Sequence, residues 1–226
     1  MMELSAVLFD RDGTLIEDRH YLGSPEGVEL VPGTGEALAI LRQRGVKSFV
    51  VSNQSGIGRG YFPESGWHAC EERLGELLSV FGAGLDDERF CPHGPDAGCS
   101  CRKPGTGMWE SLRVAHSLDP ERCVMVGDKV EDLLFGANAG LFAAVLVLSG
   151  KGERSAMKLG LDPVRIRKAG FCRADCSLPE AGKKVTRLFA AADVLAAVEG
   201  LLAWADLYPV IDKLYDGFYS RMMEKF

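Results

Sequence analysis

The chain has 226 residues, of which 46% are hydrophobic and 26% charged, and its formal net charge is −6. At about 100–200 residues per domain, this length accommodates one domain with additions but not two large domains. The acidic balance disfavours nucleic acid as a partner, because broad binding to phosphates needs a surplus of Lys and Arg. No stretch approaches the ~18 consecutive apolar residues of a spanning helix, and the first residues lack the pattern of an export signal. We therefore expect a cytoplasmic protein with no membrane partner.

Short apolar runs predict buried strands, and segments with apolar residues at helical spacing predict helices between them. In chain order, the expected elements are strand 6–9, helix 34–44, strand 49–51, helix 64–80, helix 106–117, strand 123–126, helix 130–139 and strand 143–148. An irregular loop containing Cys, Pro and Gly is expected at 91–105. Strands that alternate with helices indicate an α/β, Rossmann-like fold, in which a central parallel sheet is flanked by helices.

The last third of the chain is harder to interpret. Residues 150–184 mix Lys, Arg and Gly without clear periodicity and read as an insertion at about 150–185, and 190–202 predicts a helix. Apolar residues at helical spacing predict a final amphipathic helix within 209–224. We expect this stripe to pack on its own core in a monomer, with a dimer contact as the alternative. The expected organisation is one domain at 1–205, followed by a helical extension at 206–226.

Two carboxylates follow the first strand, in the sequence Asp10-Arg11-Asp12-Gly13-Thr14. Residues two apart in an extended segment point to the same side, so Asp10 and Asp12 can share a ligand. One carboxylate can attack phosphorus while the other protonates the leaving oxygen and later activates water. The alternative is an Asx-type turn that only closes a strand.

Further polar residues lie at the ends of the other predicted strands. Asp128 follows the third strand, and Asp132 lies in the first turn of the next helix, where its charge also suits the helix dipole. With Asp10 and a main-chain carbonyl, they offer the hard oxygen ligands that Mg²⁺ prefers. Phosphoryl transfer also needs donors and positive charge around the transferred group. These are supplied by Ser52, Arg102, Lys103 and Lys129.

Three of the seven cysteines lie within eleven residues of one another, together with a histidine. An odd number of cysteines without an export signal suits a reducing compartment, where clustered thiols hold metal more often than they form disulfides. Cys91, His93, Cys99 and Cys101 provide the four ligands of a closed, structural Zn²⁺ site in the loop 91–103. The alternative is a set of buried thiols beside a surface histidine. The other cysteines are expected to be packed or incidental, namely Cys70, Cys123, Cys172 and Cys176.

These motifs together resemble the haloacid dehalogenase (HAD) superfamily of phosphohydrolases, and within it the histidinol-phosphatase-like branch. The similarity rests on D-R-D-G-T at 10–14, S-N-Q-S-G-I-G-R-G at 52–60, the cysteine loop and G-D-K at 127–129. It covers about residues 5–150 and 186–202. It implies a HAD fold with a minimal cap formed by the zinc loop, and an Mg²⁺-dependent phosphomonoesterase that works through an aspartyl-phosphate.

The resemblance also assigns roles to residues. It makes Asp10 the nucleophile, Asp12 the general acid and base, and Ser52 and Lys103 stabilisers of the phosphoryl group. Mg²⁺ is expected on Asp10, the Asp12 carbonyl and Asp128, with Asp132 as a further candidate. The expected substrate-binding residues are Asp18, Arg19, His20, Tyr21, Asn53, Gln54, Ser55, Arg59, Arg102 and Lys129. For the segment 18–21, a mobile loop without a role in binding is the alternative.

The implied substrate is a small phosphorylated sugar. The run S-G-I-G-R-G-Y-F and G-D-K-V-E-D favour a heptose 1,7-bisphosphate that loses its 7-phosphate, a step in ADP-heptose and surface glycan biosynthesis. The five-residue gap between His93 and Cys99 is short for such enzymes and favours histidinol phosphate, the alternative. A zinc-loop binding protein without turnover is disfavoured because the whole catalytic set is present. A nucleic-acid 3′-phosphatase is disfavoured by the net charge and by the absence of a basic, aromatic-rich stripe.

Overall fold

A single sheet organises the chain. The computed structural model describes residues 3–178 and 186–207. Within these residues the sheet has seven strands, in the order β3 (Asp87–Cys91), β2 (Lys47–Asn53), β1 (Ala6–Phe9), β4 (Cys123–Gly127), β5 (Ala143–Val147), β7 (Arg187–Ala191) and β6 (Phe171–Arg173). All neighbours pair in parallel except β6, which runs antiparallel to β7. The carboxyl ends of β1, β2, β4 and β5 therefore meet along one edge of the sheet, as expected for a Rossmann-like fold.

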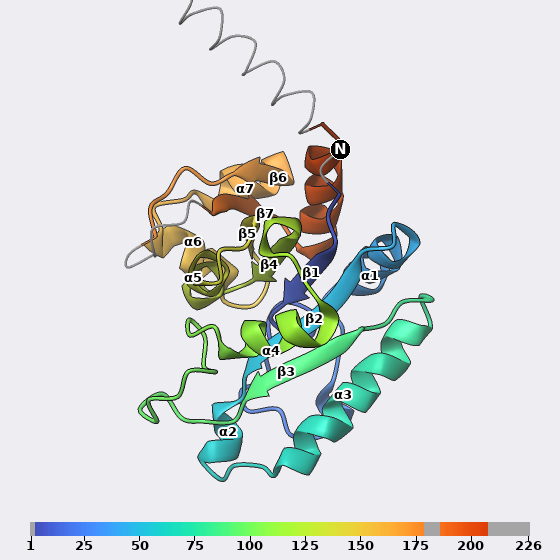
Figure 1. The fold of residues 1–226 in the computed structure, drawn as a ribbon, viewed down its shortest axis with the longest axis vertical. Coiled ribbons are helices and arrows are strands. Elements are labelled where there is room, and N and C mark those ends of the chain that lie inside the picture. Colours follow the sequence, from blue (N-terminus) through green and yellow to red (C-terminus); the bar gives the residue numbers. More distant parts are fainter. Residues whose placement is uncertain (1–2, 179–185, 208–226) are drawn as a thin grey trace, which may run out of the picture.

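Helices cover both faces of this sheet, so the molecule has three layers (Figure 1). One face packs against α1 (Thr34–Gln43), α3 (Glu64–Ser79) and a helix at 194–207. The other face packs against α4 (Gly107–His116), α5 (Val130–Asn138), α6 (Gly152–Lys158) and α7 (Pro163–Ala169). Short elements complete the chain, namely α2 (Ser55–Gly58) and the 3₁₀ turns η1 (Pro25–Gly27) and η2 (Pro120–Arg122).

The continuous apolar runs of the central strands arise because both faces of the sheet are buried. In β1, Val7 and Phe9 contribute to the core under α1 and α3, whereas Ala6 and Leu8 contribute to the core under α4 and α5. All four residues are completely buried. Alternate side chains of a strand point to opposite faces, so a strand covered by helices on both sides needs apolar residues at every position.

The four predicted strands and the four predicted helices are all confirmed within one or two residues at most ends. The prediction of a helix over 190–202 is wrong at its start, because residues 190 and 191 end strand β7 and the helix begins at 194. The stretch 150–184, in which no elements were predicted, contains α6, α7 and β6. Strand β3 was also missed.

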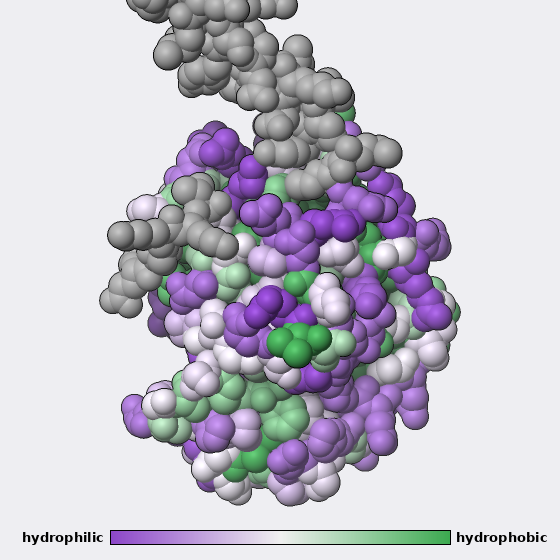
Figure 2. Space-filling view, viewed as in Figure 1, coloured by the Kyte–Doolittle hydropathy of each residue, from purple (hydrophilic) through white to green (hydrophobic). Residues whose placement is uncertain are grey.

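The predicted amphipathic helix at 209–224 lies outside the described residues, as does its alternative role as a dimer contact. No helix in residues 3–178 and 186–207 combines the length and hydropathy needed to cross a membrane. On the face shown in Figure 2, hydrophilic residues predominate and hydrophobic residues form scattered patches.

Candidate active site

A pocket of about 470 Å³ lies at the edge of the sheet where the parallel strands end. It brings together most of the residues that the sequence singled out. Its lining comprises Asp10, Asp12, Asp18, His20, Tyr21, Leu22, Ser52, Asn53, Gln54, Ser55, Pro95, Arg102, Lys103, Lys129, Glu131, Asp132 and Lys151. Such a position is where α/β folds bind their ligands.

Asp10 lies at the base of the pocket, between two lysines from different loops. Lys103 Nζ donates to Asp10 Oδ1 at 2.9 Å, and Lys129 Nζ donates to Asp10 Oδ2 at 2.7 Å. Burial alone would raise the pKa of Asp10, but the two ammonium groups outweigh it and hold that pKa well below its usual range. Asp10 is therefore an ionised carboxylate, which a nucleophile must be.

The Asp12 carboxylate is oriented by donors on two sides. Arg11 donates to Asp12 Oδ2 through Nε at 3.1 Å and to Oδ1 through Nη2 at 3.0 Å. Gln54 Nε2 donates to Asp12 Oδ2 at 2.7 Å. The side chain keeps 20% of its surface exposed, so it faces the pocket and can reach a bound molecule.

Three carboxylates lie close enough to share a cation. Oxygen atoms of Asp10, Asp128 and Asp132 lie within 4.8 Å of one another, and all three residues are buried. Burial raises the pKa of Asp128 to about 7, with help from the neighbouring acids and against the charge of Lys129. Burial likewise raises the pKa of Asp132. A buried cluster of acids of this kind is strained electrostatically until a cation neutralises it.

The Lys129 ammonium lies among the very oxygens that a divalent cation would use. Its Nζ is 2.7 Å from Asp10 Oδ2, 3.0 Å from Asp128 Oδ1 and 3.2 Å from the Asp12 carbonyl oxygen. Asp128 Oδ1 makes this ion pair but has no hydrogen-bond partner. Two carboxylates and a carbonyl converging on one positive charge form a set of hard oxygen donors, which fits Mg²⁺.

Asp132 has both oxygens engaged by the protein. Its Oδ1 lies 2.7 Å from Lys103 Nζ, and its Oδ2 accepts from the Lys129 amide at 3.0 Å. The second contact is part of a capping box at the start of α5. Asp132 therefore contacts Lys103 in the site and also caps the first turn of α5. Both roles that the sequence suggested for it, in the site and at the helix terminus, correspond to contacts in the structure.

The loop after β5 forms the wall behind Asp128. Gly13, at φ +91°, and Gly150, at φ +54°, lie so close that a Cβ on either one would come within 2.4 Å of Asp128 Oδ2. The Lys151 amide donates to the same oxygen at 2.7 Å, and Ser149 Oγ donates to the Gly13 carbonyl at 2.7 Å. These glycines are required because the two loops touch through their main chains, which leaves no space for a side chain.

The polar loop after β2 arranges its neighbours as well as facing the pocket. Gln54 Nε2 donates to Ser52 Oγ at 2.8 Å, in addition to its bond with Asp12. Asn53 exchanges two hydrogen bonds with the main chain of Lys103, at 2.9 and 3.1 Å. Lys103 Nζ also donates to the Val51 carbonyl at 2.7 Å. Asn53 and Gln54, both predicted to bind substrate, therefore position the groups on either side of Asp10.

The segment 18–21 is brought to the pocket only in part. Asp18, His20 and Tyr21 line it, and both His20 and Tyr21 have positive φ, at 49° and 58°. Arg19 is exposed, lies outside the lining and pairs with Glu29 instead. Asp18 is anchored by Lys151, whose Nζ lies 2.8 Å from Asp18 Oδ2.

Arg59 was predicted to help place the substrate, but the structure does not bring it to the pocket. It is exposed just after α2 and is absent from the lining residues. Conversely, Lys151 lines the pocket but was not predicted. It occurs in Gly150-Lys151-Gly152, inside the stretch without periodicity, and only its position three residues after the fourth predicted strand could have marked it.

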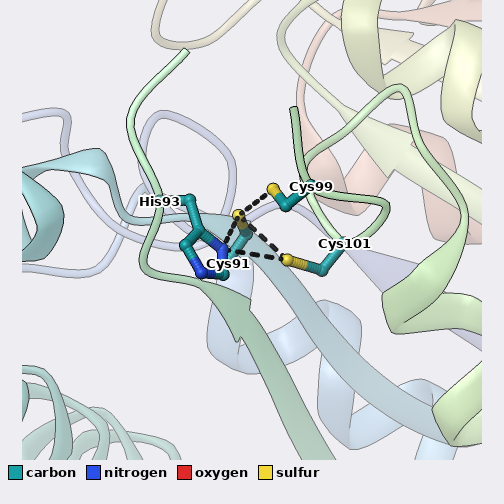
Figure 3. A group of neighbouring side chains, drawn as sticks. All are labelled: Cys91, His93, Cys99 and Cys101. Carbon is teal, nitrogen blue, oxygen red and sulfur yellow. Dashed lines mark hydrogen bonds between the residues drawn. The ribbon is translucent and has the colours of Figure 1, made fainter. Parts of the chain in front are cut away.

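The predicted zinc ligands converge at one place beside the pocket (Figure 3). Cys91 Sγ lies 3.6 Å from Cys99 Sγ and 3.3 Å from Cys101 Sγ, and His93 Nδ1 lies 3.3 Å from Cys101 Sγ. Ligands on a tetrahedral zinc ion with bonds of about 2.3 Å lie about 3.8 Å apart, so the four atoms need to move only slightly to hold one. The cluster thus allows a zinc site.

The cluster fixes the loop that delivers two residues to the pocket. Arg102 Nη1 donates to the His93 carbonyl at 3.3 Å, and Lys103 follows directly. Burial raises the pKa of Cys91 to about 12. Burial acts in the same direction on Cys99, but the Arg102 amide and the neighbouring thiols outweigh it and lower that pKa to about 7. One thiol of the group is therefore readily deprotonated, as metal binding requires.

Comparison with known proteins gives the class first. A family model described as "HAD-hyrolase-like" matches residues 100–168. The chain is also similar to the crystal structure of the D,D-heptose 1,7-bisphosphate phosphatase from Bordetella bronchiseptica complexed with magnesium and phosphate, with a TM-score of 0.72 and 28% identity. That similarity covers 88% of this chain and 98% of the other. These matches define a phosphatase of the HAD class.

Two curated relatives give the family. A D-glycero-beta-D-manno-heptose-1,7-bisphosphate 7-phosphatase of Haemophilus ducreyi is 39% identical over 167 residues, which cover 69% of this chain and 92% of the relative. A D-glycero-D-manno-heptose-1,7-bisphosphate 7-phosphatase of Thermosynechococcus vestitus is 39% identical over 68% of this chain and 83% of the relative. The chain belongs to the family of heptose-1,7-bisphosphate 7-phosphatases. The predicted HAD resemblance, the α/β fold and the phosphoric monoester hydrolase class are therefore confirmed.

Proposed function

We propose that the chain hydrolyses the 7-phosphate of D-glycero-D-manno-heptose 1,7-bisphosphate with Asp10 as nucleophile. One observation carries the proposal: a buried, ionised Asp10 lies between Lys103 and Lys129, with Asp12 beside it on the pocket wall. The substrate comes from the names of relatives that are up to 39% identical.

In the first step, an oxygen of Asp10 attacks phosphorus and the bond between phosphorus and the sugar oxygen breaks. Asp12 gives its proton to the leaving oxygen, so the sugar departs as an alcohol. Lys103 and Ser52 stabilise the transferred group. Because Ser52 Oγ accepts from Gln54, its own hydrogen can be donated to a phosphoryl oxygen.

In the second step, water attacks the phosphorus of the aspartyl-phosphate. Asp12, now a carboxylate, takes a proton from that water, and the bond between phosphorus and the Asp10 oxygen breaks. Inorganic phosphate leaves, and both carboxyl groups return to their starting states. The same residue acts as acid and then as base, which its partly exposed position allows.

The residues suited to hold Mg²⁺ are Asp10, Asp128 and the main-chain carbonyl of Asp12. When bound, the ion neutralises charge on the phosphoryl oxygens. Lys129 contacts all three ligands and lines the pocket, so its charge is also within reach of a substrate phosphate. Asp132 contributes by holding Lys103.

Substrate recognition is assigned to the residues around the mouth of the pocket. Asp18, His20 and Tyr21 approach from one side, and Arg102 approaches from the loop that carries the zinc ligands. We assign the zinc a structural role, because four protein ligands leave no open coordination position for water or substrate.

The test is phosphate release in the presence of Mg²⁺ from heptose 1,7-bisphosphate and histidinol phosphate, compared side by side. Histidinol phosphate is included because the gap of five residues between His93 and Cys99 favours it. Asp10→Asn should abolish release, since an amide retains the shape of the side chain but cannot attack phosphorus. Near-normal turnover by that variant would overturn the mechanism, and a preference for histidinol phosphate would overturn the substrate.

A further inference from the structure

The residue between the two catalytic carboxylates has a buried side chain that the proposed mechanism does not use. Arg11 belongs to the D-R-D-G-T motif, yet its side chain is completely buried beneath the pocket. Its guanidinium lies 4.1 Å from the centre of the Trp67 ring, which supports one face of the group. Removing a guanidinium from water is costly, so a position like this requires compensating partners.

The guanidinium is held at both ends. At one end, Nε and Nη2 donate to the two oxygens of Asp12. At the other end, Nη1 donates to Glu71 Oε1 at 2.9 Å. Glu71 belongs to α3, is 60 positions away in the sequence and is buried. The arrangement is a chain of contacts from a core helix, through Arg11, to the carboxylate that faces the substrate.

The contacts distinguish the two oxygens of Asp12. Oδ2 accepts from both Arg11 Nε and Gln54 Nε2, at 3.1 and 2.7 Å. Oδ1 accepts only from Arg11 Nη2, at 3.0 Å, among the contacts of the described residues. A carboxylate oxygen that already accepts two hydrogen bonds is the poorer site for a proton. The proton that is passed to the leaving group therefore belongs on Oδ1.

We propose that Arg11 and Glu71 are positioning residues that fix the plane of the Asp12 carboxyl group, so that Oδ1 delivers its proton to the leaving oxygen. The planar fork of an arginine suits this task, because its nitrogens hold both oxygens of a carboxylate at once. Glu71 prevents the fork from rotating. This inference rests on the proposed role of Asp12 as the general acid.

A purely structural role for Arg11 and Glu71 makes a different prediction. If the chain of contacts only stabilised the core, weakening it would reduce the amount of folded enzyme and would slow all substrates equally. If it orients the acid, weakening it must slow substrates with a poor leaving group most. An alkyl phosphate needs its leaving oxygen protonated, whereas p-nitrophenyl phosphate releases a stable phenolate without help.

The experiment compares the kcat values of Glu71→Leu, Glu71→Gln and the unchanged protein on heptose 1,7-bisphosphate and on p-nitrophenyl phosphate. Leucine removes the acceptor for Arg11, and glutamine retains one. General acids contribute about 10²–10⁴-fold, so a misaligned one is expected to cost Glu71→Leu roughly 30-fold on the sugar phosphate and less than about threefold on the aryl phosphate. Glu71→Gln should remain within about threefold of the unchanged protein on both. Glu72→Leu, at the exposed neighbouring position on α3, is the matched control.

If Glu71→Leu does not fold, Arg11→Lys replaces it, because lysine retains the charge but cannot span two oxygens of Asp12 and one of Glu71. Equal losses on both substrates, or no loss on either, would overturn the inference. Failure of the proposed function is separate and visible in the unchanged protein, which would then release no phosphate from the sugar substrate or would keep its activity in Asp10→Asn.

Discussion

Replacing Lys129 with methionine should tighten Mg²⁺ binding. Lys129 Nζ is within 3.2 Å of the Asp10, Asp12 and Asp128 oxygens that are suited to hold the ion. The ion and the ammonium cannot both occupy this position. In the unchanged protein, part of the binding free energy of Mg²⁺ is therefore spent on displacing an internal cation.

The size of the effect follows from the distances. Two unit charges about 3 Å apart attract by about 5.5 kcal/mol at an effective dielectric constant of about 20. Lys129 makes two such pairs, with Asp10 and Asp128. When Mg²⁺ displaces the ammonium group, water and the groups at the mouth of the pocket solvate it and compensate for much of this lost attraction. A net gain of about 1.4–2.8 kcal/mol corresponds to roughly 10–100-fold tighter Mg²⁺ binding in Lys129→Met.

Isothermal titration with MgCl₂, without substrate and at the same pH for both proteins, measures this directly. The metal-free variant should also melt at a lower temperature than the unchanged protein, since it loses one of the two ammonium groups that neutralise its acidic cluster, and Mg²⁺ should restore the difference. Lys151→Met, which removes a nearby charge 2.8 Å from Asp18, is the matched control. Unchanged or weaker Mg²⁺ binding in Lys129→Met would refute the reasoning.

Three further predictions concern a glycine of the site, an ion pair at the edge of the sheet and the zinc cluster. Gly13→Ala places a Cβ 2.4 Å from Asp128 Oδ2 at a φ of +91°. The displaced carboxylate should bind Mg²⁺ at least about tenfold more weakly in a titration. An unchanged affinity would show that the loop moves to make room for the methyl group. Although burial opposes them, Arg89 and His116 lower the pKa of Asp87 to about 2. An aspartate whose pKa is lower in the folded protein than in the unfolded chain, where it is 3.8, stabilises the fold at pH values above 3.8. In melting experiments at neutral pH, Asp87→Asn should therefore lower the free energy of unfolding by up to about 1 kcal/mol. This difference should vanish as the pH falls through about 2. Protein purified without chelator should contain one zinc ion per chain, and its removal should lower the melting temperature; metal analysis without zinc would contradict the four-ligand assignment.

The sequence predicts the centre of the sheet far better than its edges. Strands β1, β2, β4 and β5 are buried on both faces and are therefore apolar throughout, which is the pattern that sequence analysis detects best. Strand β3 is the edge strand D-E-R-F-C, whose residues are mostly half-buried, so no apolar run marks it. Strand β7 ends in Ala190-Ala191 and runs almost directly into a helix rich in alanine, so the two were read as one element.

The same contrast holds for the site. Residues inside short motifs at strand ends, such as Asp10, Ser52 and Asp128, were predictable because a parallel sheet brings strand ends together. The positioning roles of Asn53 and Gln54 were not, since they depend on which partner each amide meets across the pocket. Lys151 lies in a stretch without any motif, and its place in the pocket follows only from the contact of its loop with Gly13 and Asp128.

The loop 91–103 is held at both ends and free in the middle. It begins at the outermost strand, its four metal-ligand candidates converge, and its last residue is joined to the strand β2 by the bonds between Asn53 and the Lys103 main chain. Between His93 and Cys99, by contrast, residues 95–98 are exposed, so the length there can change without altering strand register or the two cores. Such a change would move Pro95 on the pocket wall while Lys103 keeps its contact with Asp10. One wall of the pocket can therefore diverge while the surroundings of Asp10 are retained.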